Sequence, residues 1–439
     1  MVHDGRISRE GTGTTNWLAR LTRRDLVRTI TVSAGAVVFA GYGKSNWVTA
    51  ADKIKITQWY HQYGEKGTQQ AAQRYAEAYT KENPNVEVEM VWKPGDYSGT
   101  ELPAALLTNQ GPDVYEGSPT VAMVQAGQVA PLDDLFTPEV KADFDPHDID
   151  VNTINGHIYA VKMIDDMGLL YCRKSMFDKA GVKPPTTFDE VMSVAKELNS
   201  GRTKGLFLGN DGGISALFTL LPQSAGAEII KGDKIVFNDA KTVAAYTKLK
   251  ELNDSGTLLI GSPTDWWDPS AFTQGLSAMQ WTGLWAMPGI KSAIQEDFEV
   301  VPWPAFDASG KPVTFWGGWS EMVNPKGKYV DEAKKFVKWL WIDKKDFQAD
   351  WSLSYGFHVP PRKSVAANAE PLKSGAAKQA VDILYANGQI LPPQWTQAMI
   401  TTLTNAVSNI VKNGADPTKE VASASQKCQD ELTKVLSGS

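Results

Sequence analysis

The chain has 439 residues, of which 42% are hydrophobic and 21% charged, and its formal net charge is −6. This composition is that of a globular protein and excludes disordered and fibrous classes, while the length exceeds one compact core and suits two lobes. Residues 1–50 hold seven Lys or Arg against three Asp or Glu, so the remainder carries about −10. An acidic body without a basic stripe argues against nucleic acid as a partner.

The N-terminal segment has the features of an export signal. Arg23-Arg24 precede apolar residues, as in twin-arginine signals, and a weakly apolar segment follows at residues 30–40. That segment is too short to span a bilayer as a stable helix. Val48-Thr49-Ala50 then resembles a signal-peptidase site. We therefore predict that residues 1–50 are a twin-arginine-type signal peptide, recognised by the twin-arginine export machinery, and that cleavage near Ala50 leaves the protein in the periplasm.

The chain after this signal begins with a pattern of strand, helix and strand. Residues 54–59 alternate apolar and polar side chains, residues 69–79 carry helix formers at helical spacing, and residues 86–91 alternate again. This order is the start of a parallel α/β sheet. A helix at 102–108 and a buried strand at 111–115 follow, so the first lobe is predicted to be α/β.

Past residue 165 the pattern shifts toward helices, several of them bounded by Gly or Pro. Helical spacing predicts helices at 188–198, 240–252, 331–342, 376–386 and 396–411. Short strands are predicted between them at 235–237 and 298–301.

Two cysteines, Cys172 and Cys428, lie far apart in the sequence. An exported protein could pair them, but two distant cysteines do not make a disulfide framework. Cys172 follows the apolar run Leu169-Leu170-Tyr171, where a small buried thiol is the simpler interpretation. The sequence therefore leaves open whether Cys172 and Cys428 pair, and it gives no reason to propose a bridge.

Tryptophan is concentrated in one stretch of the chain. Seven of the fifteen tryptophans fall within it: Trp266, Trp267, Trp281, Trp285, Trp303, Trp316 and Trp319. Several lie beside Gly or Pro, which a core helix or strand would avoid. Rings on turns are free to line a cleft, and their flat faces suit a ligand with apolar faces and a polar rim, as a sugar has. Burial of each ring in a core is the alternative.

No catalytic or metal-binding motif occurs. The sequence lacks G-x-S-x-G, Walker A, G-x-G-x-x-G, H-E-x-x-H and C-x-x-C patterns, and its five histidines are scattered. Asp165-Asp166 and Asp133-Asp134 could serve a glycosidase, but adjacent acids on a strand point to opposite faces. These absences remove the reasons to propose an enzyme, and we assign no catalytic residue, no metal ligand and no cofactor; whether a metal binds stays open.

Six blocks of sequence occur in a characteristic order. They are 111–114 with 127–135, 155–161, 170–188, 272–285, 317–319 and 356–362. Together, from Lys53 to about Leu436, they resemble the maltose-binding-protein-like group of extracellular solute-binding proteins, family 1, which serve carbohydrate ABC importers. The resemblance implies the two-lobe α/β periplasmic-binding-protein fold, type II-like, whose lobes close on a ligand about a hinge.

The same resemblance implies where each lobe begins and ends. The first lobe is predicted at 51–164 and 311–364, and the second lobe at 165–310 and 365–439. The chain would then cross the hinge near Asp165, near Lys311 and between Val365 and Ser374.

The resemblance also implies the ligand contacts. Trp285 matches the tryptophan that stacks on the sugar, and Asp165 matches an acid near the hinge that accepts hydrogen bonds from hydroxyls, with Asp166 as its alternative. The other candidates come from the loop after the first strand, the cleft edge, the tryptophan stretch and the turn at Pro360-Pro361. They are Tyr60, His61, Tyr63, Glu116, Ser118, Trp266, Trp267, Trp316, Gly318, Trp319 and Arg362.

Some of these assignments stay open. One of Trp316 and Trp319 is expected to face the ligand, and Arg362 either contacts the ligand or braces the turn beside it. Trp266 and Trp267 have no counterpart in the family pattern, and Cys172 and Leu284 depart from it, which leaves the identity of the ligand open.

The predicted function is capture of a mono- or oligosaccharide and its delivery to the transmembrane subunits of an ABC permease. A polyol or glycerol phosphodiester is the alternative ligand, although a phosphate would want clustered Arg or Lys in the cleft. A secreted carbohydrate-active enzyme and a sugar sensor or adhesin are further alternatives. The protein is expected to act as a monomer.

Overall fold

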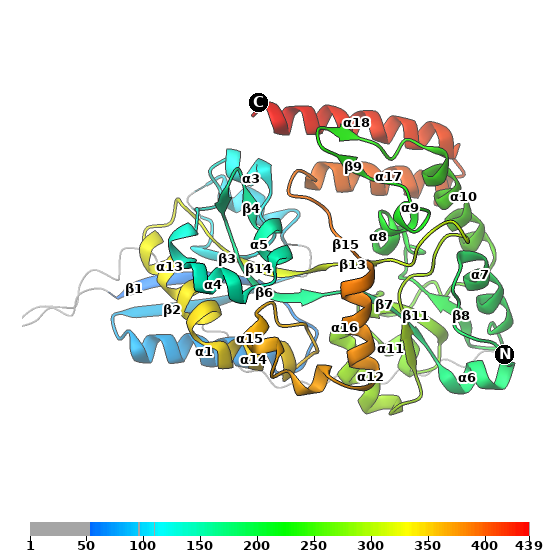
Figure 1. Cartoon of the computed structure of the whole chain (residues 1–439), viewed down its shortest axis with the longest axis horizontal. Helices are drawn as coiled ribbons and strands as arrows, with labels where there is room; N and C mark the ends of the chain where they lie inside the picture. Colours follow the sequence, from blue (N-terminus) through cyan, green and yellow to red (C-terminus); the bar gives the residue numbers. More distant parts are fainter. Residues whose placement is uncertain (1–52, 95–96, 109, 439) are drawn as a thin grey trace, which may run out of the picture. The chain divides into compact units, whose positions relative to one another are not determined.

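The computed structural model describes residues 53–94, 97–108 and 110–438 (Figure 1). The predicted signal peptide and its cleavage site lie outside these residues. Within them, two larger β-sheets, one of five strands and one of four, form the framework. We use "first lobe" for the five-stranded sheet with the helices packed on it, and "second lobe" for the four-stranded sheet with its helices.

The five-stranded sheet has the strand order β2-β1-β3-β14-β6. Its strands are β1 (Ile54–His61), β2 (Val86–Lys93), β3 (Val114–Gly117), β6 (Val161–Asp166) and β14 (Gly317–Val323). β1 pairs in parallel with β2 and β3, and helix α1 (Thr68–Glu82) connects β1 to β2 as the sequence pattern predicts. β14 is antiparallel to β3 and β6, so a late segment of the chain lies inside the first lobe.

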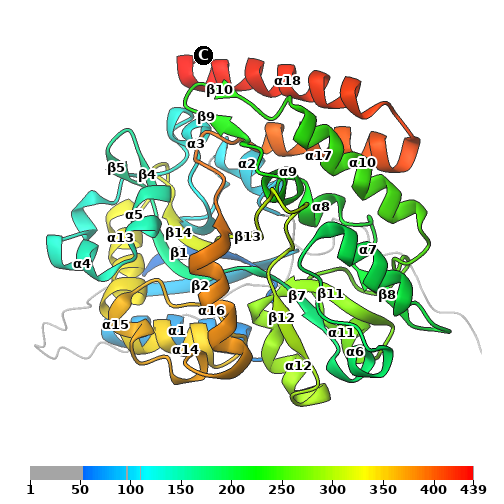
Figure 2. The same cartoon turned by 45° about the vertical axis from the view of Figure 1, so that its right-hand side comes forward.

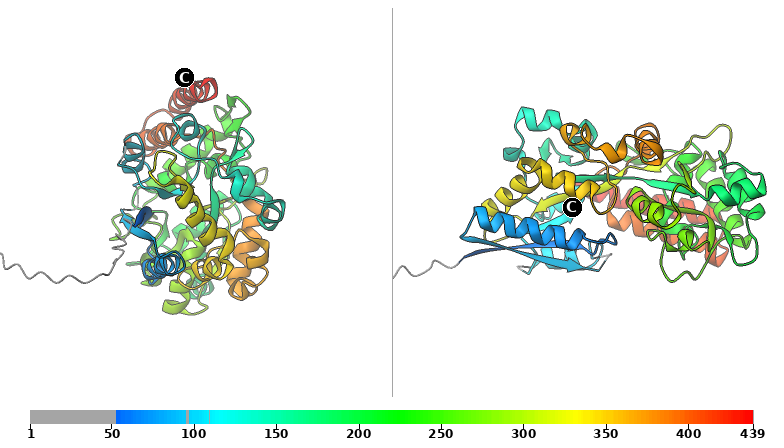
Figure 3. Two further views of the ribbon diagram at one scale, coloured as in Figure 1. Left: turned by 90° about the vertical axis from the view of Figure 1, so that its left-hand side faces the viewer. Right: turned by 90° about the horizontal axis from the view of Figure 1, so that it is seen from below.

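Both faces of this sheet are covered, because neighbouring residues of a strand point to opposite sides. Val114 and Val323 pack on one face with α1, α13 (Val330–Lys338) and α14 (Lys345–Leu353). Figure 3 shows α1 alongside β2 on this face. Tyr115 and Met322 pack on the other face with α2 (Glu101–Leu106) and α3 (Val121–Gln125).

The four-stranded sheet has the order β12-β7-β11-β8. Its strands are β7 (Gly168–Cys172), β8 (Lys204–Phe207), β11 (Ser277–Gly283) and β12 (Glu299–Val301). Every residue of β7 is buried, because Leu170 and Cys172 pack into one core cluster and Leu169 and Tyr171 into another. Burial on both faces explains why this strand reads as an apolar run without alternation.

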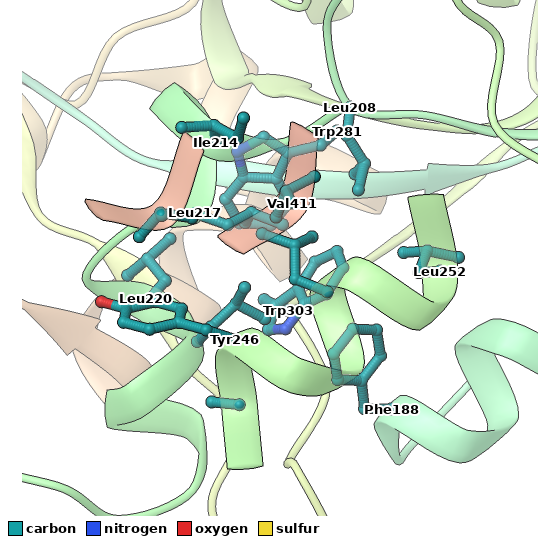
Figure 4. Close-up of a cluster of buried hydrophobic side chains, with 14 of the residues drawn as sticks. Phe188, Leu208, Ile214, Leu217, Leu220, Tyr246, Leu252, Trp281, Trp303 and Val411 are labelled. Carbon is teal, nitrogen blue, oxygen red and sulfur yellow. The ribbon is translucent and has the colours of Figure 1, made fainter. Parts of the chain in front are cut away.

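Helices enclose the main core of the second lobe. They are α7 (Phe188–Glu197), α10 (Ala240–Asp254), α17 (Gln397–Asn413) and α18 (Pro417–Ser437). Trp281 and Trp303 are fully buried in this core, edge to face with centroids 5.9 Å apart, and Phe188 packs against Trp303 (Figure 4). For these two rings of the tryptophan stretch, burial in a core is therefore the observed arrangement.

Capping residues determine where these helices begin. Thr187 and Glu190 form a capping box at α7, in which each side chain bonds the backbone of the other. Asp416 caps α18 and Pro417 occupies its first turn, a combination typical of helix starts. The sequence pattern did not single out α18, although it spans 21 residues and packs beside α17 (Figure 2).

The chain passes from the first sheet to the second between β6 and β7, where Met167 alone separates the two strands. It returns through β13 (Thr314–Phe315), which pairs with β15 (Gly388–Gln389) and immediately precedes β14. These passages lie near Asp165 and close after Lys311, which are two of the three predicted hinge positions. The exact lobe boundaries stay predictions.

The remaining elements are short or peripheral. The helices are α4 (Pro138–Asp143), α5 (Pro146–Val151), α6 (Lys174–Ala180), α8 (Ile214–Leu217), α9 (Leu220–Ser224), α11 (Ser270–Thr273), α12 (Met287–Ile294), α15 (Lys363–Ala366) and α16 (Gly375–Asn387). The strands are β4 (Thr153–Ile154), β5 (His157–Ile158), β9 (Ile230–Lys231) and β10 (Lys234–Ile235).

Most predicted elements occur in the structure with small shifts at their ends. The predicted helix at 331–342 is divided, because α13 ends at Lys338 and a π-helical turn, Trp339–Asp343, continues it. The predicted strand at 235–237 is the short β10, and the predicted helix at 102–108 ends at Leu106.

No helix among residues 53–94, 97–108 and 110–438 is long and apolar enough to cross a membrane. In the same residues, Cys172 and Cys428 are buried free thiols, on β7 and α18. The described side chains also include no group of three or more His, Cys, Asp or Glu that could hold a metal ion.

Candidate ligand-binding site

A cavity of about 760 Å³ lies between the first lobe and the second lobe. Its wall includes residues of α2, α3 and β14 from the first lobe, and residues of α9 and of segment 389–400 from the second. The volume lies in the upper part of the range for small-molecule pockets, roughly 300–1,000 Å³. Predicted contacts that line it are Glu116, Ser118, Trp266, Trp316, Gly318 and Trp319.

Trp316 and Trp319 flank the start of β14, where the chain enters the first lobe. Between them Gly318 has a φ of 98°, and a Cβ at this position would come within 2.1 Å of the Ile164 carbonyl oxygen. Only glycine fits this combination of conformation and close approach. The pairing of β14 with β6 shifts register between Trp319 and Ser320, and such a bulge re-aims neighbouring side chains. Both tryptophans thereby reach the wall of the cavity.

Buried charged groups support Trp316 from behind. Its indole N–H donates to Asp165 Oδ1 at 2.9 Å, and Lys162 Nζ lies 3.2 Å from the same oxygen. Lys162 also donates to the Gly317 carbonyl at 2.8 Å. The Lys162 and Asp165 side chains are only 6% and 2% exposed, so they hold each other's charge in a nearly water-free environment.

Helix α5 places two further titratable groups beside this ion pair. Burial, reinforced by the charge of Asp165, raises the pKa of Asp148 well above its usual value. Burial also lowers the pKa of His147, which lines the cavity 4.1 Å from the Trp316 ring centroid. Burial likewise opposes the charge on Lys162, but the Asp165 carboxylate outweighs it and raises the pKa of Lys162. The wall beside Trp316 therefore combines the ion pair of Lys162 and Asp165 with two groups, His147 and Asp148, whose charged forms are disfavoured by burial.

Glu116 organises the loop after β1. Its buried carboxylate accepts hydrogen bonds from the His61 backbone and from the Tyr63 hydroxyl at 2.8 Å, and it also contacts the His61 ring. The His61 ring in turn lies against Trp319, with centroids 4.4 Å apart. His61 and Tyr63 are thus held behind Trp319, one layer away from the cavity.

Glu321 lies next to Glu116, because the two residues pair across β14 and β3. Its carboxylate accepts from Gln58, from the Tyr60 hydroxyl at 3.1 Å and from the Trp341 indole at 2.6 Å. Burial, and to a smaller extent the charge of Glu116, raises the pKa of Glu321 to about 8. Tyr60 therefore belongs to a buried hydrogen-bond network inside the first lobe.

Asp166 belongs to a separate buried cluster at the first passage between the lobes. Asp166 Oδ1 lies 2.7 Å from His358 Nδ1, and Glu65 Oε1 lies 3.4 Å from His358 Nε2. Burial favours the neutral ring, but the two carboxylates outweigh it and raise the pKa of His358 to about 10. His358 is therefore charged at neutral pH and holds Asp166 to the loop that carries Glu65.

The second-lobe tryptophans form a layer around Phe315. Trp266 and Phe315 line the cavity, and Trp285 stacks on Phe315 with centroids 6.5 Å apart. The Trp285 ring lies so close to Gly283 that a Cβ there would meet it at 1.9 Å, and its indole N–H donates to the Trp267 carbonyl at 3.0 Å. Trp285 is thus one ring removed from the cavity, and Trp267 is 51% exposed outside the wall.

Arg362 is buried within the first lobe. Its guanidinium donates to Asp143 Oδ2 at 2.7 and 3.0 Å and to the Ile342 carbonyl. Burial raises the pKa of Asp143, but its contacts with Ser364 and Arg362 outweigh this and lower the pKa to about 2. In this structure Arg362 braces the turn rather than lining the cavity.

The structure therefore places the predicted contacts in two groups. Outside the wall lie Tyr60, His61, Tyr63, Asp165, Asp166, Trp267, Trp285 and Arg362. Of these, His61, Asp165 and Trp285 each touch a ring that lines the wall. Contact of any of the fourteen with a ligand stays a prediction.

Sequence reasoning missed several wall residues. They include Lys162, His147, Gln128, Gln223, Phe315 and Trp395. Lys162 had a local signal, because it is a lone cation within the apolar run from Tyr159 to Ile164. Gln223 and Trp395 had none, since they reach the cavity only through the packing of α9 and α17 in the second lobe.

The fold and the interlobe cavity define a two-lobe solute-binding protein, and the comparison with known sequences agrees. Residues 64–341, more than half of the chain, match the family of bacterial extracellular solute-binding proteins. The chain belongs to this family, whose members bind solutes for ABC transporters and are not enzymes.

Curated relatives cover most of the chain. An ABC transporter extracellular-binding protein of Pyrococcus horikoshii is 22% identical over 80% of this chain and 82% of its own length. The multiple sugar-binding protein of Streptococcus mutans is 24% identical over 70% of this chain and 76% of its own length.

Solved structures show the same fold. The GacH receptor of Streptomyces glaucescens, determined unliganded and with acarbose, has a TM-score of 0.73 and 24% identity, covering 87% of this chain and 99% of its own. A solute-binding protein of Thermotoga lettingae bound to α-D-tagatose has a TM-score of 0.74 and 19% identity, covering 87% and 100%. At these identities the likeness establishes the α/β periplasmic-binding-protein fold.

Proposed function

We propose that this protein captures a mono- or oligosaccharide in the cavity between its lobes and delivers it to the transmembrane subunits of an ABC permease. The observation that carries the proposal is the position of Trp316 and Trp319 in the wall, with the buried ion pair of Lys162 and Asp165 beside Trp316. Relatives named as multiple sugar-, maltotriose- and lactose-binding proteins support the same ligand class.

The chemistry of the wall suits a sugar ring. The apolar face of a pyranose can lie on an indole, while its rim of hydroxyls needs donors and acceptors. His147, Asn152, Gln128 and Ser320 offer such groups in the same wall. Each hydrogen bond made in this way contributes about 0.5–1.5 kcal/mol to affinity.

A phosphorylated ligand fits this wall less well. Lys162 is the one Lys or Arg that lines the cavity within the described residues, and it is already paired with Asp165. Arg362 is bonded to Asp143 away from the wall. A glycerol phosphodiester would therefore have no unpaired cation to meet its charge. A polyol remains a second candidate, because it shares the hydroxyls but lacks a flat face for stacking.

We infer that the protein acts in the periplasm after export by the twin-arginine machinery and removal of residues 1–50. The paired arginines, the apolar segment and the small residues before Ala51 support this inference. N-terminal sequencing of the secreted protein tests it. A mature end near Ala51 is expected, and retention of Arg23-Arg24 would contradict it.

A thermal-shift screen of the mature protein against sugars and polyols tests the proposed ligand class. A ligand bound only by the folded state raises the melting temperature by mass action. At a concentration of one hundred times Kd, it increases the free energy of unfolding by about 2.7 kcal/mol. We expect at least one sugar to raise it and glycerol phosphodiesters to leave it unchanged. The proposal fails if only a polyol or phosphodiester acts, or if the protein converts a bound sugar into products.

A further inference from the structure

The cavity has two chemically different ends along strand β14. Trp316 and Trp319 lie at the start of the strand, and Met322 lies near its end. Trp319 and Met322 are three residues apart, which is about 10 Å at 3.3 Å per residue along an extended strand. We call the part around Trp316 and Trp319 the aromatic end, and the part around Leu102, Leu106, Met123 and Met322 the apolar end.

The apolar end is lined by aliphatic side chains of the first lobe. Leu102 and Leu106 come from α2, Met123 from α3 and Met322 from β14, and all four belong to one hydrophobic cluster. The Met322 methyl group lies over Gly117, where a Cβ would approach it to 2.8 Å. Polar side chains of the neighbouring segments also line the cavity, namely Ser98, Ser118, Thr120 and Gln128, and the Thr120 hydroxyl accepts the Met123 N–H as the cap of α3.

The second lobe closes this end with a further apolar wall. Leu391, Pro392 and Pro393 line the cavity opposite α3, and the Val121 N–H donates to the Pro393 carbonyl at 3.0 Å. The end of α18 also reaches the first lobe, since Val435 packs into the same cluster as Leu102. The apolar end is thus bounded by both lobes.

A second sugar ring would be poorly served here. A sugar needs a flat face to stack on and polar partners for its hydroxyls, whereas branched and linear aliphatic groups offer neither. Burying hydroxyls against Leu102, Met123 and Leu391 without partners would weaken binding. Alkyl or aryl surface gains affinity in the same place, because it leaves water.

We propose that the ligand is a glycoside with an apolar substituent, whose sugar occupies the aromatic end and whose aryl or alkyl aglycone occupies the apolar end. This inference rests on the proposed function. It adds that the apolar end selects an aglycone over a second sugar ring.

Isothermal titration of the mature protein tests the inference with matched ligands. The probes are the methyl and phenyl α- and β-glycosides of glucose, galactose, mannose and xylose, together with methyl maltoside and methyl cellobioside. Each methylene-sized group buried adds about fourfold in affinity, so a buried phenyl ring should add at least tenfold. We expect one phenyl glycoside to bind at least tenfold more tightly than its methyl counterpart and than the disaccharides.

The other possible outcomes separate failure of the aglycone site from failure of sugar capture. If methyl and phenyl glycosides bind equally, or a disaccharide binds most tightly, the aglycone site is wrong while sugar capture stands. If no glycoside binds, sugar capture itself is wrong, and the aglycone site with it.

Variants of the wall locate the substituent. Met123→Gln keeps the length and helix propensity of the side chain but makes it polar. It should reduce the preference for phenyl over methyl glycosides at least fivefold. The affinity for the methyl glycoside should change less than twofold. Val124→Gln is the matched control, since Val124 neighbours Met123 on α3 outside the wall. Leu391→Gln tests the opposite wall if Met123→Gln does not fold. An unchanged preference in both wall variants overturns the proposal.

Discussion

The aromatic end and the apolar end of the cavity lie on the same strand, yet they are built in different ways. At the aromatic end, a glycine with φ of 98°, a bulge and a buried ion pair hold two tryptophans in position. At the apolar end, aliphatic side chains of α2, α3 and β14 belong to an ordinary hydrophobic cluster that continues into the cavity. If the proposed ligand binds here, the first arrangement would restrict its orientation through geometry and hydrogen bonds, whereas the second would select only for apolar surface.

This difference predicts unequal responses to substitution. The aromatic end depends on buried polar groups, where removal of one partner leaves another unsatisfied. The apolar end depends on packing alone, where a change costs mainly the surface that it exposes.

The largest effect is expected from Lys162→Met. Without the ammonium, the Asp165 carboxylate stays buried with an uncompensated charge, so the free energy of unfolding should fall by about 3–5 kcal/mol. Urea denaturation measures this loss. The double variant Lys162→Met, Asp165→Asn should recover most of it, and a single-variant loss below about 1 kcal/mol would show that the ion pair does not support this end.

A smaller effect, on binding, is expected from Trp316→Ala. Truncation of a central stacking residue costs about 2 kcal/mol, or roughly thirtyfold in sugar affinity. Titration of the best sugar from the thermal-shift screen measures it. Trp267→Ala is the matched control, because this ring is 51% exposed outside the wall and its removal should change affinity less than twofold. A larger loss of affinity in Trp267→Ala than in Trp316→Ala would mean that the ligand contacts Trp267 instead.

The stability that the His358 cluster contributes at the first passage between the lobes should depend on pH. The aliphatic side chains of the apolar end carry no titratable group and should contribute no such dependence. The pKa of His358 is raised to about 10 from an ordinary 6.5, so its stabilising contribution is complete below pH 6.5 and disappears as pH rises through 10. Between pH 7 and 9 we expect the free energy of unfolding to fall by about 2.5 kcal/mol, attributable to this ring.

Comparison with His358→Gln isolates this contribution. The variant should have a lower free energy of unfolding at pH 7 and a flatter profile between pH 7 and 9. Parallel profiles for the two proteins would mean that His358 is not charged in the folded state.

The smallest effect is expected from Trp285→Ala. The resemblance to the family implies that Trp285 is the stacking residue, whereas its ring reaches the cavity in this structure only through Phe315 and Trp266. Loss of that supporting contact should weaken sugar binding by about 1 kcal/mol, roughly fivefold. A loss larger than that of Trp316→Ala, with an unchanged melting temperature of the free protein, would make Trp285 the direct contact.

The sequence predicts an element correctly where the element's own residues show the full alternation of a strand or the full spacing of a helix. The unit of β1, α1 and β2 and helices α7, α10 and α17 were predicted in this way. Strand β14 was not, because Gly317-Gly318 interrupt its pattern and its partners, β3 and β6, lie far away in the sequence. Resemblance to a family supplied the two-lobe fold, which the family match and the solved structures confirm.

The site was predictable only where a residue carries its own signal. Trp316 and Trp319 stood out through their flanking glycines, and both line the cavity. Met123, Leu391 and Gln223 look like ordinary residues of helices and loops, and only the folding of α3, α9 and segment 389–400 around one space makes them part of the wall. Long-range packing decides this, and spacing in the sequence does not encode it.

A crystal structure of the mature protein with the sugar that most raises its melting temperature tests the central claim most directly. We expect sugar density in the cavity between the lobes, with one ring face on Trp316 or Trp319 and hydroxyls toward His147 or Ser320. Density confined to the outer surface around Trp267, or a cavity that stays empty while the sugar binds elsewhere, would contradict it.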